Sequence, residues 1–390
     1  MMSNARALTT PVLIIGAGPY GIAIALELYR LRIPFLIHGE IFSLWHKHTL
    51  TDASLRSDVH VSEVFTKDRR FRLDRHLHQT LPAEQARQIC GGRVPVRLFR
   101  DYLQQVARQL PFPVASERIV NVGHDRDANF RAITESGRDI VASQIVLACG
   151  IESHRSMPHC LAKLNDDRVA HSWQVDRYEH VRDQRVLVVG SGQSAAETIA
   201  LLRPKNRVTW LYRTEPTYYA DPIALPRPVF DLAMRGSHIF SMLPHWLRLR
   251  LRQRMLGTTV TPDLKPQFNS GDVVSIRADV ESLNLQREAE GLRSHEMNLT
   301  FDRIVACTGY RYGVRNLSML EPSLRDAIVC DNDIPQLDRR FMTSLPGLYI
   351  VGAMAELKHG PAMRFMCGTR SATALVAAAI AARSARREAS

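Results

Sequence analysis

The sequence predicts an α/β protein built from two dinucleotide-binding units, and two observations carry this prediction. An apolar strand at residues 11–15 runs into Gly16–Gly21, which has the spacing G-x-G-x-x-G and precedes a helical pattern. A second apolar strand at residues 185–189 runs into Gly190–Ala195, which has the spacing G-x-G-x-x-A. We therefore expect two Rossmann-like, three-layer ββα domains of the two-dinucleotide-binding type.

Length and composition agree with two globular domains. The chain has 390 residues, of which 45% are hydrophobic and 23% charged, and its formal net charge is +12. No apolar run reaches the length of a bilayer span, and no secretory signal precedes the first strand, so we expect a cytoplasmic protein without a membrane span. The basic excess is spread along the chain without a nucleic-acid-reading motif, and we expect no nucleic acid partner.

The cysteines argue against a redox-active dithiol. The six of them form no C-x-x-C pair, and no spacing of cysteine and histidine suits zinc, so we expect no metal site. Cys149 and Cys307 each end an apolar run, and small buried thiols are common in protein cores. We expect both to be core residues.

Each glycine of the first stretch has a predicted task. Gly16 makes the tight turn, Gly18 lets a pyrophosphate approach the backbone, and Gly21 lets the helix pack closely on the strand. The anion would lie at the helix N-terminus, where free N–H groups and the helix dipole favour negative charge. The second strand of this unit ends near Glu40, which is the candidate partner of the ribose hydroxyls, although a surface glutamate is the alternative.

The second unit differs from the first at the end of its second strand. That strand, residues 208–212, ends in Arg213, 23 residues after Gly190. An NAD site would place a carboxylate there, whereas a guanidinium pairs well with a 2′-phosphate. The sequence thus favours NADPH over NADH in this unit, with a solvated strand-end arginine as the alternative. Two units in one chain predict FAD in the first and NADPH in the second, with hydride reducing the flavin.

The predicted domains are not contiguous along the chain. Residues 1–160 and 296–390 are expected to form the FAD-binding domain, and residues 161–295 the NADPH-binding domain. A helical insertion is expected at about 228–258. The further elements expected are an exposed charged insertion at 66–80, an amphipathic helix at 96–110, a strand at 348–352 and a C-terminal helix at 369–382. The last two would return to complete the flavin site.

Several motifs occur in a recognisable order. They are Gly16–Gly21, Ser43–Thr49 with the pattern S-L-W-x-x-x-T, His171–Ser172, Gly190–Glu197 with G-x-G-x-S-x-x-E, the helical stretch Asp231–Leu256, Cys307–Arg311 and Gly347–Gly352. In this order the chain resembles the class B flavin-dependent monooxygenases. The flavin-containing and YUCCA-type indole-pyruvate monooxygenases are the nearest likeness, and the N-hydroxylating amine monooxygenases are neighbours. The family's F-x-G-x-x-x-H motif is degenerate here: Asn165 stands in place of its Phe and Asp167 in place of its Gly.

The resemblance implies an activity and a set of site residues. NADPH would reduce FAD, O2 would add at the flavin C4a, and a small organic substrate would then be oxygenated. The expected cofactor-binding residues are Gly16, Gly18, Pro19, Tyr20, Gly21, Glu40, Trp45, His48, Gly150, Gly190, Gly192, Gln193, Ser194, Ala195, Glu197, Arg213, Thr308, Gly309, Tyr310, Gly352, Gly368 and Thr369. Lys47, Arg56 and Ser57 are the candidate catalytic donors.

Two other functions stay open on the sequence. The degenerate motif allows an NAD(P)H-dependent flavoprotein reductase that passes electrons to a partner protein without oxygenation. Intact nucleotide fingerprints also fit a nucleotide-sensing regulatory protein. The identity of the substrate, whether amine, sulfide, ketone or 2-oxo acid, is not predicted by the sequence, and neither is the oligomeric state.

Overall fold

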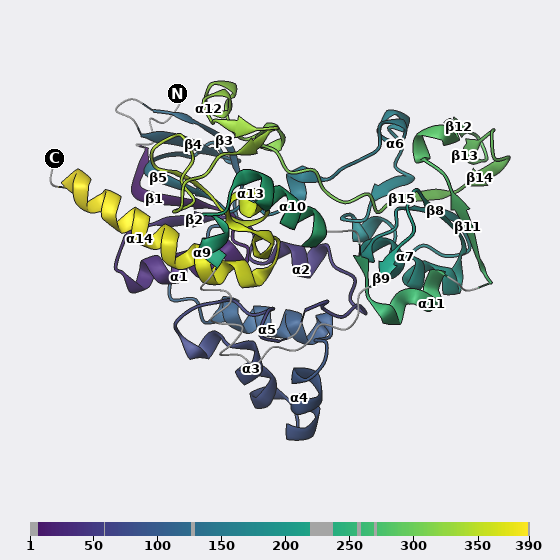
Figure 1. Ribbon diagram of the computed structural model, residues 1–390, viewed down its shortest axis with the longest axis horizontal. Helices are drawn as coiled ribbons and strands as arrows, with labels where there is room; N and C mark the ends of the chain where they lie inside the picture. The colour runs from purple at the N-terminus through teal and green to yellow at the C-terminus, as the bar shows by residue number, and fades with distance from the viewer. Residues whose placement is uncertain are drawn as a thin grey trace.

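The computed structural model describes residues 7–57, 59–125, 129–218, 237–255, 259–268 and 271–388. Within these residues the chain forms two sheet-centred units, with a group of helices beneath the first unit (Figure 1). This is the predicted α/β fold with two dinucleotide-binding units. Among the described helices, none has both the length and the apolar character needed to cross a bilayer.

The first unit is built on a sheet with the strand order β2-β1-β5-β4-β3, and β18 also pairs with β5. The strands are β1 (Leu8–Ile15), β2 (Leu36–His38), β3 (Ile119–His124), β4 (Phe130–Thr134), β5 (Asp139–Leu147) and β18 (Leu348–Ile350). Strands β2, β1, β5 and β18 are parallel, whereas β3 and β4 form an antiparallel meander. Residues 12–15 of β1 are all buried, as expected for a parallel strand covered on both faces.

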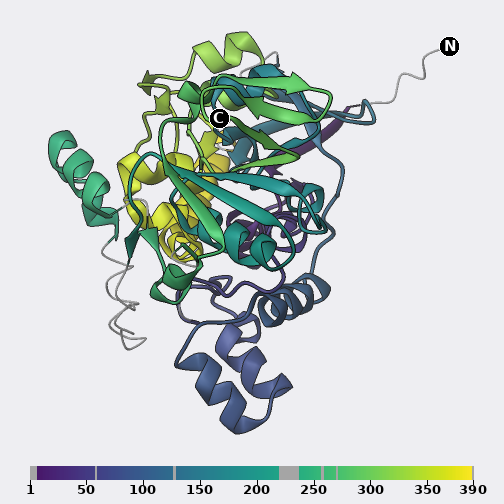
Figure 2. The same cartoon turned by 90° about the vertical axis from the view of Figure 1, so that its right-hand side faces the viewer.

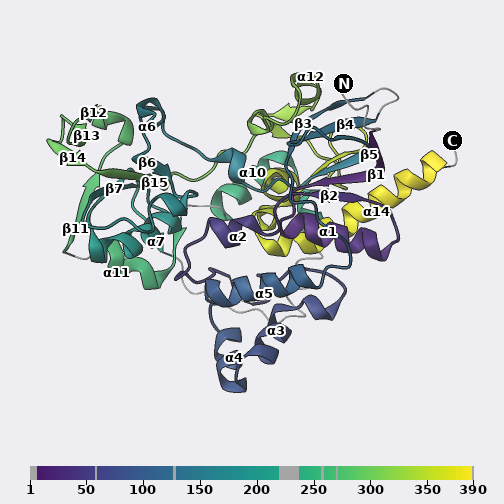
Figure 3. The same ribbon diagram turned by 180° about the vertical axis from the view of Figure 1, so that it is seen from behind.

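Two helices from opposite ends of the chain pack together against this sheet. They are α1 (Pro19–Arg30) and α14 (Thr369–Glu388). Figures 1 and 3 show them side by side. Strand β18 and helix α14 thus return to the first unit, as predicted. Helix α14 continues beyond the expected end at residue 382, and the Arg387 guanidinium donates a hydrogen bond to Asn129 Oδ1 at 3.0 Å.

The second unit is built on a parallel sheet with the strand order β11-β8-β7-β15-β6. Its elements are β6 (Val169–His171), β7 (Arg185–Val189), α7 (Gln193–Leu202), β8 (Arg207–Tyr212), β11 (Val273–Arg277) and β15 (Arg303–Ala306), with an antiparallel meander of β12 (Leu285–Glu288), β13 (Gly291–Ser294) and β14 (Leu299–Phe301). Because β15 lies between β7 and β6, the second unit continues to residue 306. The expected boundary at 295 is therefore too early: after the meander the chain adds one more strand before it crosses back.

A helical group lies beneath the first unit. It consists of α2 (Ser43–Lys47), the short helical turn η1 (Arg69–Phe71), α3 (Leu73–Thr80), α4 (Ala83–Cys90) and α5 (Val96–Arg108). Figure 3 shows α5 between α1 and the α3–α4 pair. Residues 66–80, expected as an exposed charged insertion, bury Phe71, Leu73 and Leu77 in the main core. Arg69, Arg70 and Arg75 are exposed, whereas Arg72 and Asp74 are partly buried, so the segment is only partly the exposed insertion that was expected.

The remaining elements are short. They are α6 (His159–Leu164), β9 (Thr217–Tyr218), α9 (Ser237–Phe240), α10 (His245–Met255), β10 (Thr259–Val260), α11 (Lys265–Phe268), α12 (Pro322–Asp326), β16 (Cys330–Asp331), β17 (Ile334–Pro335) and α13 (Glu356–His359). Helices α9 and α10 fall within the predicted insertion, whose residues 228–236 and 256–258 lie outside the described residues. Figure 2 shows α10 standing out from the body of the molecule.

A buried carboxylate attaches α10 to the first unit. Glu356 on α13 is 2% exposed and forms ion pairs with Arg252 of α10, at 2.5 Å, and with Arg364. Removing this carboxylate would leave two partly buried guanidinium groups without their shared partner. We expect Glu356→Ala to lower the free energy of unfolding by about 2–4 kcal/mol, measured by urea denaturation. Glu281→Ala makes the same change at an exposed glutamate of the second unit and should lower the free energy of unfolding by less. An equal decrease for both variants would contradict this role of Glu356.

Candidate functional site

The first glycine-rich loop has three glycines with different surroundings. Gly16 has φ +109°, and a Cβ there would lie 2.2 Å from Ala148 O. A Cβ on Gly21 would lie 1.9 Å from Gly16 O, so both positions exclude side chains for packing reasons. Gly18 is different: its φ is −76°, and apart from its chain neighbours no described residue has an atom within 4 Å of the Cβ position. Open space therefore lies beside the N-terminus of α1, where a pyrophosphate would be favoured.

Glu40, which follows β2, forms an ion pair with Lys47 of α2. The Lys47 ammonium lies 2.6 Å from the Glu40 carboxylate, and both side chains are about half exposed. Gly39, which precedes Glu40, packs against the glycine-rich loop: a Cβ there would lie 2.8 Å from Ala17 N. Lys47 was expected as a catalytic donor, but the ion pair groups it with the residue predicted to contact the ribose.

Trp45 lies on the adjoining short helix α2. Its ring meets Phe99 edge-on with 4.9 Å between the centroids. Its indole Nε1 is buried and has no hydrogen-bond partner among the described residues. A buried N–H without a partner is unfavourable, and an acceptor on a bound cofactor would relieve it.

The C-terminal part of the chain closes on the first loop through Tyr20. The Tyr20 hydroxyl lies 2.9 Å from Met363 O. A Cβ on Gly352, which has φ +79°, would touch the Tyr20 ring at 3.8 Å, and a Cβ on Gly368 would lie 2.2 Å from the hydroxyl. Thr369 follows as the first residue of α14 and is fully buried. The sequence predicted Tyr20, Gly352, Gly368 and Thr369 separately, and the structure brings them together where the C-terminal part of the chain meets the first glycine-rich loop.

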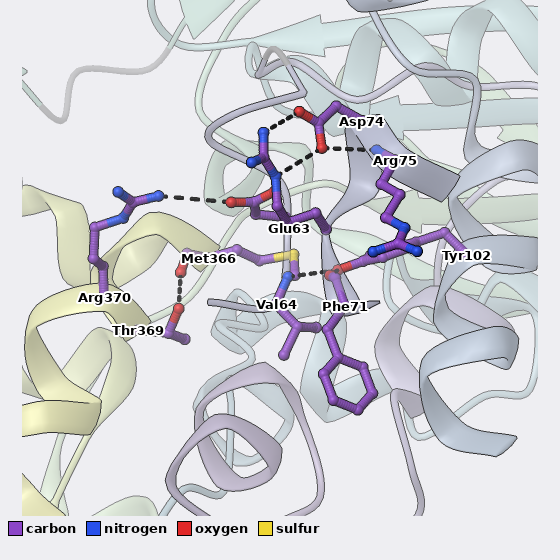
Figure 4. A network of polar contacts seen from close by, with 10 residues as sticks. Glu63, Val64, Phe71, Asp74, Arg75, Tyr102, Met366, Thr369 and Arg370 are labelled. Atoms are coloured by element: carbon purple, nitrogen blue, oxygen red, sulfur yellow. Dashed lines mark hydrogen bonds and ion pairs between the residues drawn. The ribbon is translucent and has the colours of Figure 1, made fainter. Parts of the chain in front are cut away.

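A polar network fastens residues 63–65 to the first turn of α14 (Figure 4). Glu63 is 2% exposed and its carboxylate lies 3.6 Å from the Arg370 guanidinium, which also lies 3.9 Å from the centroid of the Phe65 ring. The backbone N–H of Val64 donates to the Tyr102 hydroxyl at 2.8 Å. Sequence reasoning missed Glu63 and Arg370. The available signal was a lone glutamate in the apolar stretch around Val64, since a buried carboxylate needs a cation.

The second glycine-rich loop repeats the geometry of the first. Gly190 has φ +129°, a Cβ there would lie 2.3 Å from Cys307 O, and its N–H donates to Leu211 O at 2.9 Å. Gly192 is the N-cap of α7, and Ala195 in its first turn is fully buried. Ala195 therefore occupies the close-packed position that Gly21 occupies in the first unit.

Arg56 of the first unit reaches across to β10, which packs against α7 of the second unit. Its guanidinium donates to Thr259 Oγ1 at 2.7 Å. Next to it, Gln193 donates to Glu197 Oε1 at 2.8 Å, and its own Oε1 accepts from the Thr261 backbone N–H at 3.0 Å. Arg56 was expected beside the flavin together with Lys47 and Ser57. The structure places the Arg56 guanidinium at β10 of the second unit and the Lys47 ammonium beside Glu40, and the catalytic role of the three donors stays a prediction.

Glu197, beside this loop, should make the stability of the folded protein depend on pH. Burial raises the pKa of Glu197 from its ordinary 4.5 to about 7, against the lowering effects of the Gln193 hydrogen bond and the Arg56 charge. The folded state therefore holds a proton that the unfolded state releases between pH 4.5 and 7, and stability falls as pH rises through this window. We expect a fall of up to ~1.4 kcal/mol per pH unit without added NADPH.

Glu197→Gln, which cannot ionise, should lose this part of the pH dependence. Urea midpoints of both proteins at several pH values between 4.5 and 8 measure it. Parallel curves for the variant and the wild-type protein would show that Glu197 does not titrate in this range.

Two arginines lie at the ends of neighbouring strands in the second unit. Arg213 follows β8, and its guanidinium is 80% exposed and lies 3.6 Å from Asp279 Oδ2. Arg277 ends β11 and pairs in register with Tyr212. An exposed ion pair at this distance is weak, so Arg213 stays available to a phosphate. Ser194, also predicted to bind the nucleotide, is exposed on the first turn of α7. Sequence reasoning missed Arg277.

Two segments of the chain that cross between the units, one containing Ser156 and the other Thr308 and Gly309, run alongside each other. Thr308 Oγ1 donates to Ser156 O, and the Ser156 N–H donates to Gly309 O at 2.9 Å. Gly150 and Gly309 have φ of +69° and +72°, and, chain neighbours aside, no atom of the described part of the chain lies within 4 Å of either Cβ position. These predicted residues therefore form a linked pair of crossings with open space beside their glycines.

A contact between rings joins the units near these crossings. His48 of the first unit stacks on Trp173 of the second, with 4.1 Å between ring centroids, and His48 Nδ1 donates to Trp173 O at 2.9 Å. Tyr310 meets both Trp173 and His171 edge-on. The sequence singled out His48, His171 and Tyr310 separately, but it gave no signal for Trp173, because an isolated tryptophan after a short strand is usual for a core residue.

The thiols of Cys149 and Cys307 lie where they are unreactive. All six cysteines are free, and burial raises the pKa of Cys149 and of Cys307 to about 12. A thiol with so high a pKa is poorly nucleophilic at neutral pH. Among the described residues, no group of three His, Cys, Asp or Glu side chains gathers as a metal-binding set.

Comparison with known proteins places this geometry among flavin and nicotinamide enzymes. The probable indole-3-pyruvate monooxygenase YUCCA9 of Arabidopsis thaliana is 25% identical over 339 residues, which cover 77% of this chain and 75% of the relative. Ferredoxin–NADP reductase 1 of Bacillus cytotoxicus is 23% identical over 285 residues, covering 71% of each chain.

A solved structure of similar fold is the ornithine N-hydroxylase of Kutzneria sp. 744, with reduced FAD, NADP⁺ and L-ornithine. It has a TM-score of 0.79 and 18% identity, and the match covers 96% of this chain and 100% of that one. At this identity the likeness shows the fold alone. A family model described as pyridine nucleotide-disulphide oxidoreductase matches residues 13–225. That match spans more than half of the sequence, and the chain therefore belongs to the pyridine nucleotide-disulphide oxidoreductase family.

Proposed function

We propose that the protein is an NADPH-dependent FAD monooxygenase that oxygenates a small organic substrate with O2. The observation that carries this proposal is the pair of glycine-rich cradles, each at a strand-to-helix turn, in two units that meet at His48 and Trp173. FAD bound in the first unit would supply the two-electron chemistry, accepting hydride from NADPH and reacting with O2. The protein's part is to hold the two cofactors in contact and to keep water out.

The residues of the first unit fit FAD. Pro19 begins α1 with a backbone that is already suited to the helix, and Gly18 leaves space for a pyrophosphate in front of the N–H groups of α1. The buried Trp45 Nε1 needs an acceptor, and the start of α14 at Thr369 offers a second helix N-terminus. A helix N-terminus stabilises the negative charge that a reduced flavin carries.

The apolar residues near this site would exclude water. Leu55 is 6% and Met363 1% exposed, whereas Phe365 is 43% exposed. A dry pocket is needed because water promotes loss of activated oxygen as peroxide. Phe365 is therefore better placed at a rim than within a sealed wall.

The relatives support oxygenation and divide on the substrate. The structural neighbour is an ornithine N-hydroxylase, and a sequence relative is a probable indole-3-pyruvate monooxygenase. We propose a primary amine or a 2-oxo acid as the first classes to examine. We also propose a cytoplasmic location, where NADPH is available and free cysteines stay reduced.

Isotopically labelled O2 tests the proposal. Purified protein with bound FAD would be supplied with NADPH, labelled O2 and a panel of diamines, basic amino acids, sulfides, ketones and 2-oxo acids. The NADPH consumed in forming peroxide is first subtracted. The expected result is then one labelled oxygen atom in a product for each remaining NADPH oxidised. NADPH oxidation that yields peroxide alone with the whole panel would refute the monooxygenase proposal.

A flavoprotein reductase is the second candidate, favoured by the degenerate motif before His171. In this segment Asn165 ends α6 with φ +42°, and the exposed Asp167 forms an ion pair with Arg177. The relative named as a ferredoxin–NADP reductase is consistent with it. Rapid NADPH-driven reduction of ferredoxin, without oxygenated product, would select this function over the first.

A further inference from the structure

We propose that Trp173 is a nucleotide-binding residue whose indole N–H donates a hydrogen bond to an oxygen on the nicotinamide half of NADP(H). This inference rests on the proposed function. It starts from an unfavourable feature: Trp173 is 5% exposed, and its buried Nε1 has no hydrogen-bond partner among the residues that the structure describes. Buried indole N–H groups usually find an acceptor, so an orphaned one points to a missing partner.

The sheet order places Trp173 at one particular end of the dinucleotide. In the order β11-β8-β7-β15-β6, the glycine-rich loop follows β7 and Arg213 follows β8 on one side of it. Trp173 follows β6 on the other side, beyond Tyr310, which follows β15. A dinucleotide lies across the carboxyl ends of the strands with its adenosine ribose at the second strand of the unit. With the 2′-phosphate at Arg213, the nicotinamide half extends toward β15 and β6.

The first unit meets the second at this same end. His48 stacks on the Trp173 ring at 4.1 Å with 19° between the planes, and Tyr310 meets the ring edge-on at 6.5 Å. Hydride transfer requires the nicotinamide to reach the flavin, so its half of the cofactor must lie where the units touch. The orphaned N–H is therefore at the expected end of the dinucleotide.

Trp173 is also held rigidly. Its backbone N–H donates to His171 Nδ1 at 3.1 Å, and its carbonyl accepts from His48 Nδ1 at 2.9 Å. Because His171 Nδ1 accepts, its Nε2 carries the proton and donates to Gly309 O at 3.1 Å. Burial lowers the pKa of His171 to about 4, so this ring is neutral at physiological pH. With its backbone bonded on both sides and one ring face stacked on His48, the indole loses little freedom when a ligand binds.

The test compares two ligands on two variants of the FAD-loaded protein. Trp173→Phe keeps an aromatic ring for His48 but removes the N–H donor. Trp246→Phe, at a residue 63% exposed on α10, is the matched control. Calorimetry would measure the Kd of NADP⁺ and of 2′,5′-ADP, which carries the 2′-phosphate but lacks the nicotinamide half.

The expected result is a rise of about three- to tenfold in the Kd of NADP⁺ for Trp173→Phe, with the Kd of 2′,5′-ADP unchanged. The control should change neither. An unchanged Kd of NADP⁺ would overturn the inference, and so would an equal loss for both ligands, which would mark Trp173 as structural. Failure of the wild-type protein to bind either ligand would contradict the proposed function and, with it, this inference.

Discussion

Replacing Gly18 with valine is expected to give a folded protein that purifies with at most about a tenth of the wild-type FAD content. Gly18 has φ −76°, which suits any residue, and among the residues that the structure describes only its chain neighbours come within 4 Å of its Cβ position. The fold therefore tolerates a side chain that the pyrophosphate does not. Gly21→Val should behave differently, because its Cβ would lie 1.9 Å from Gly16 O and the strand-to-helix packing would fail.

Gly271→Val is the control for this experiment. Gly271 also has open space around its Cβ position, and it precedes β11 at the opposite end of the second sheet from the glycine-rich loop. Flavin absorbance per chain measures FAD content, and binding of 2′,5′-ADP reports on the second unit. A yellow Gly18→Val protein with stoichiometric FAD would mean that FAD does not bind at the first loop.

Replacing Arg213 with alanine is expected to lower kcat/KM for NADPH about tenfold and to leave kcat/KM for NADH unchanged. The guanidinium is exposed and shares its charge with Asp279, so the loss is smaller than for a buried phosphate contact. Arg277 at the end of β11 should supply part of the remaining preference, and the Arg213→Ala/Arg277→Ala protein should discriminate less than either single variant.

Arg207→Ala is the matched control, since Arg207 begins the same strand and lies at its other end. Steady-state rates with both nucleotides measure the preference. An equal loss for NADPH and NADH would place Arg213 outside the 2′-phosphate site, and no loss for either would show a solvated strand-end residue.

The local geometry of the cradles was predictable because it depends on neighbouring residues. A strand, a turn and a helix within about a dozen residues fix the roles of Gly16, Gly18 and Gly21. The second loop followed from the same rules, and Ala195 is the close-packed residue in place of a third glycine. For the same reason the returning strand β18 and helix α14 were found near their expected positions.

The contacts between the units were not predictable, because they join residues far apart in the chain. Arg56 bonds Thr259, and His48 stacks on Trp173, so neither pair has a local sequence pattern. The catalytic role of Lys47, Arg56 and Ser57 stays a prediction, because no local pattern indicated that Arg56 would bond a residue of the second unit. The domain boundary was missed for a related reason: residues 303–306 form a short strand whose neighbours in the sheet come from elsewhere in the chain.

Mixing the NADPH-reduced protein with O2 in a stopped-flow spectrometer, without substrate, tests the central claim most directly. The expected result is a distinct, long-lived absorbing species before the oxidised flavin spectrum returns, because the buried apolar side chains and bound NADP⁺ would keep water from the flavin. Direct return to oxidised flavin, with stoichiometric peroxide and no such species, would contradict it.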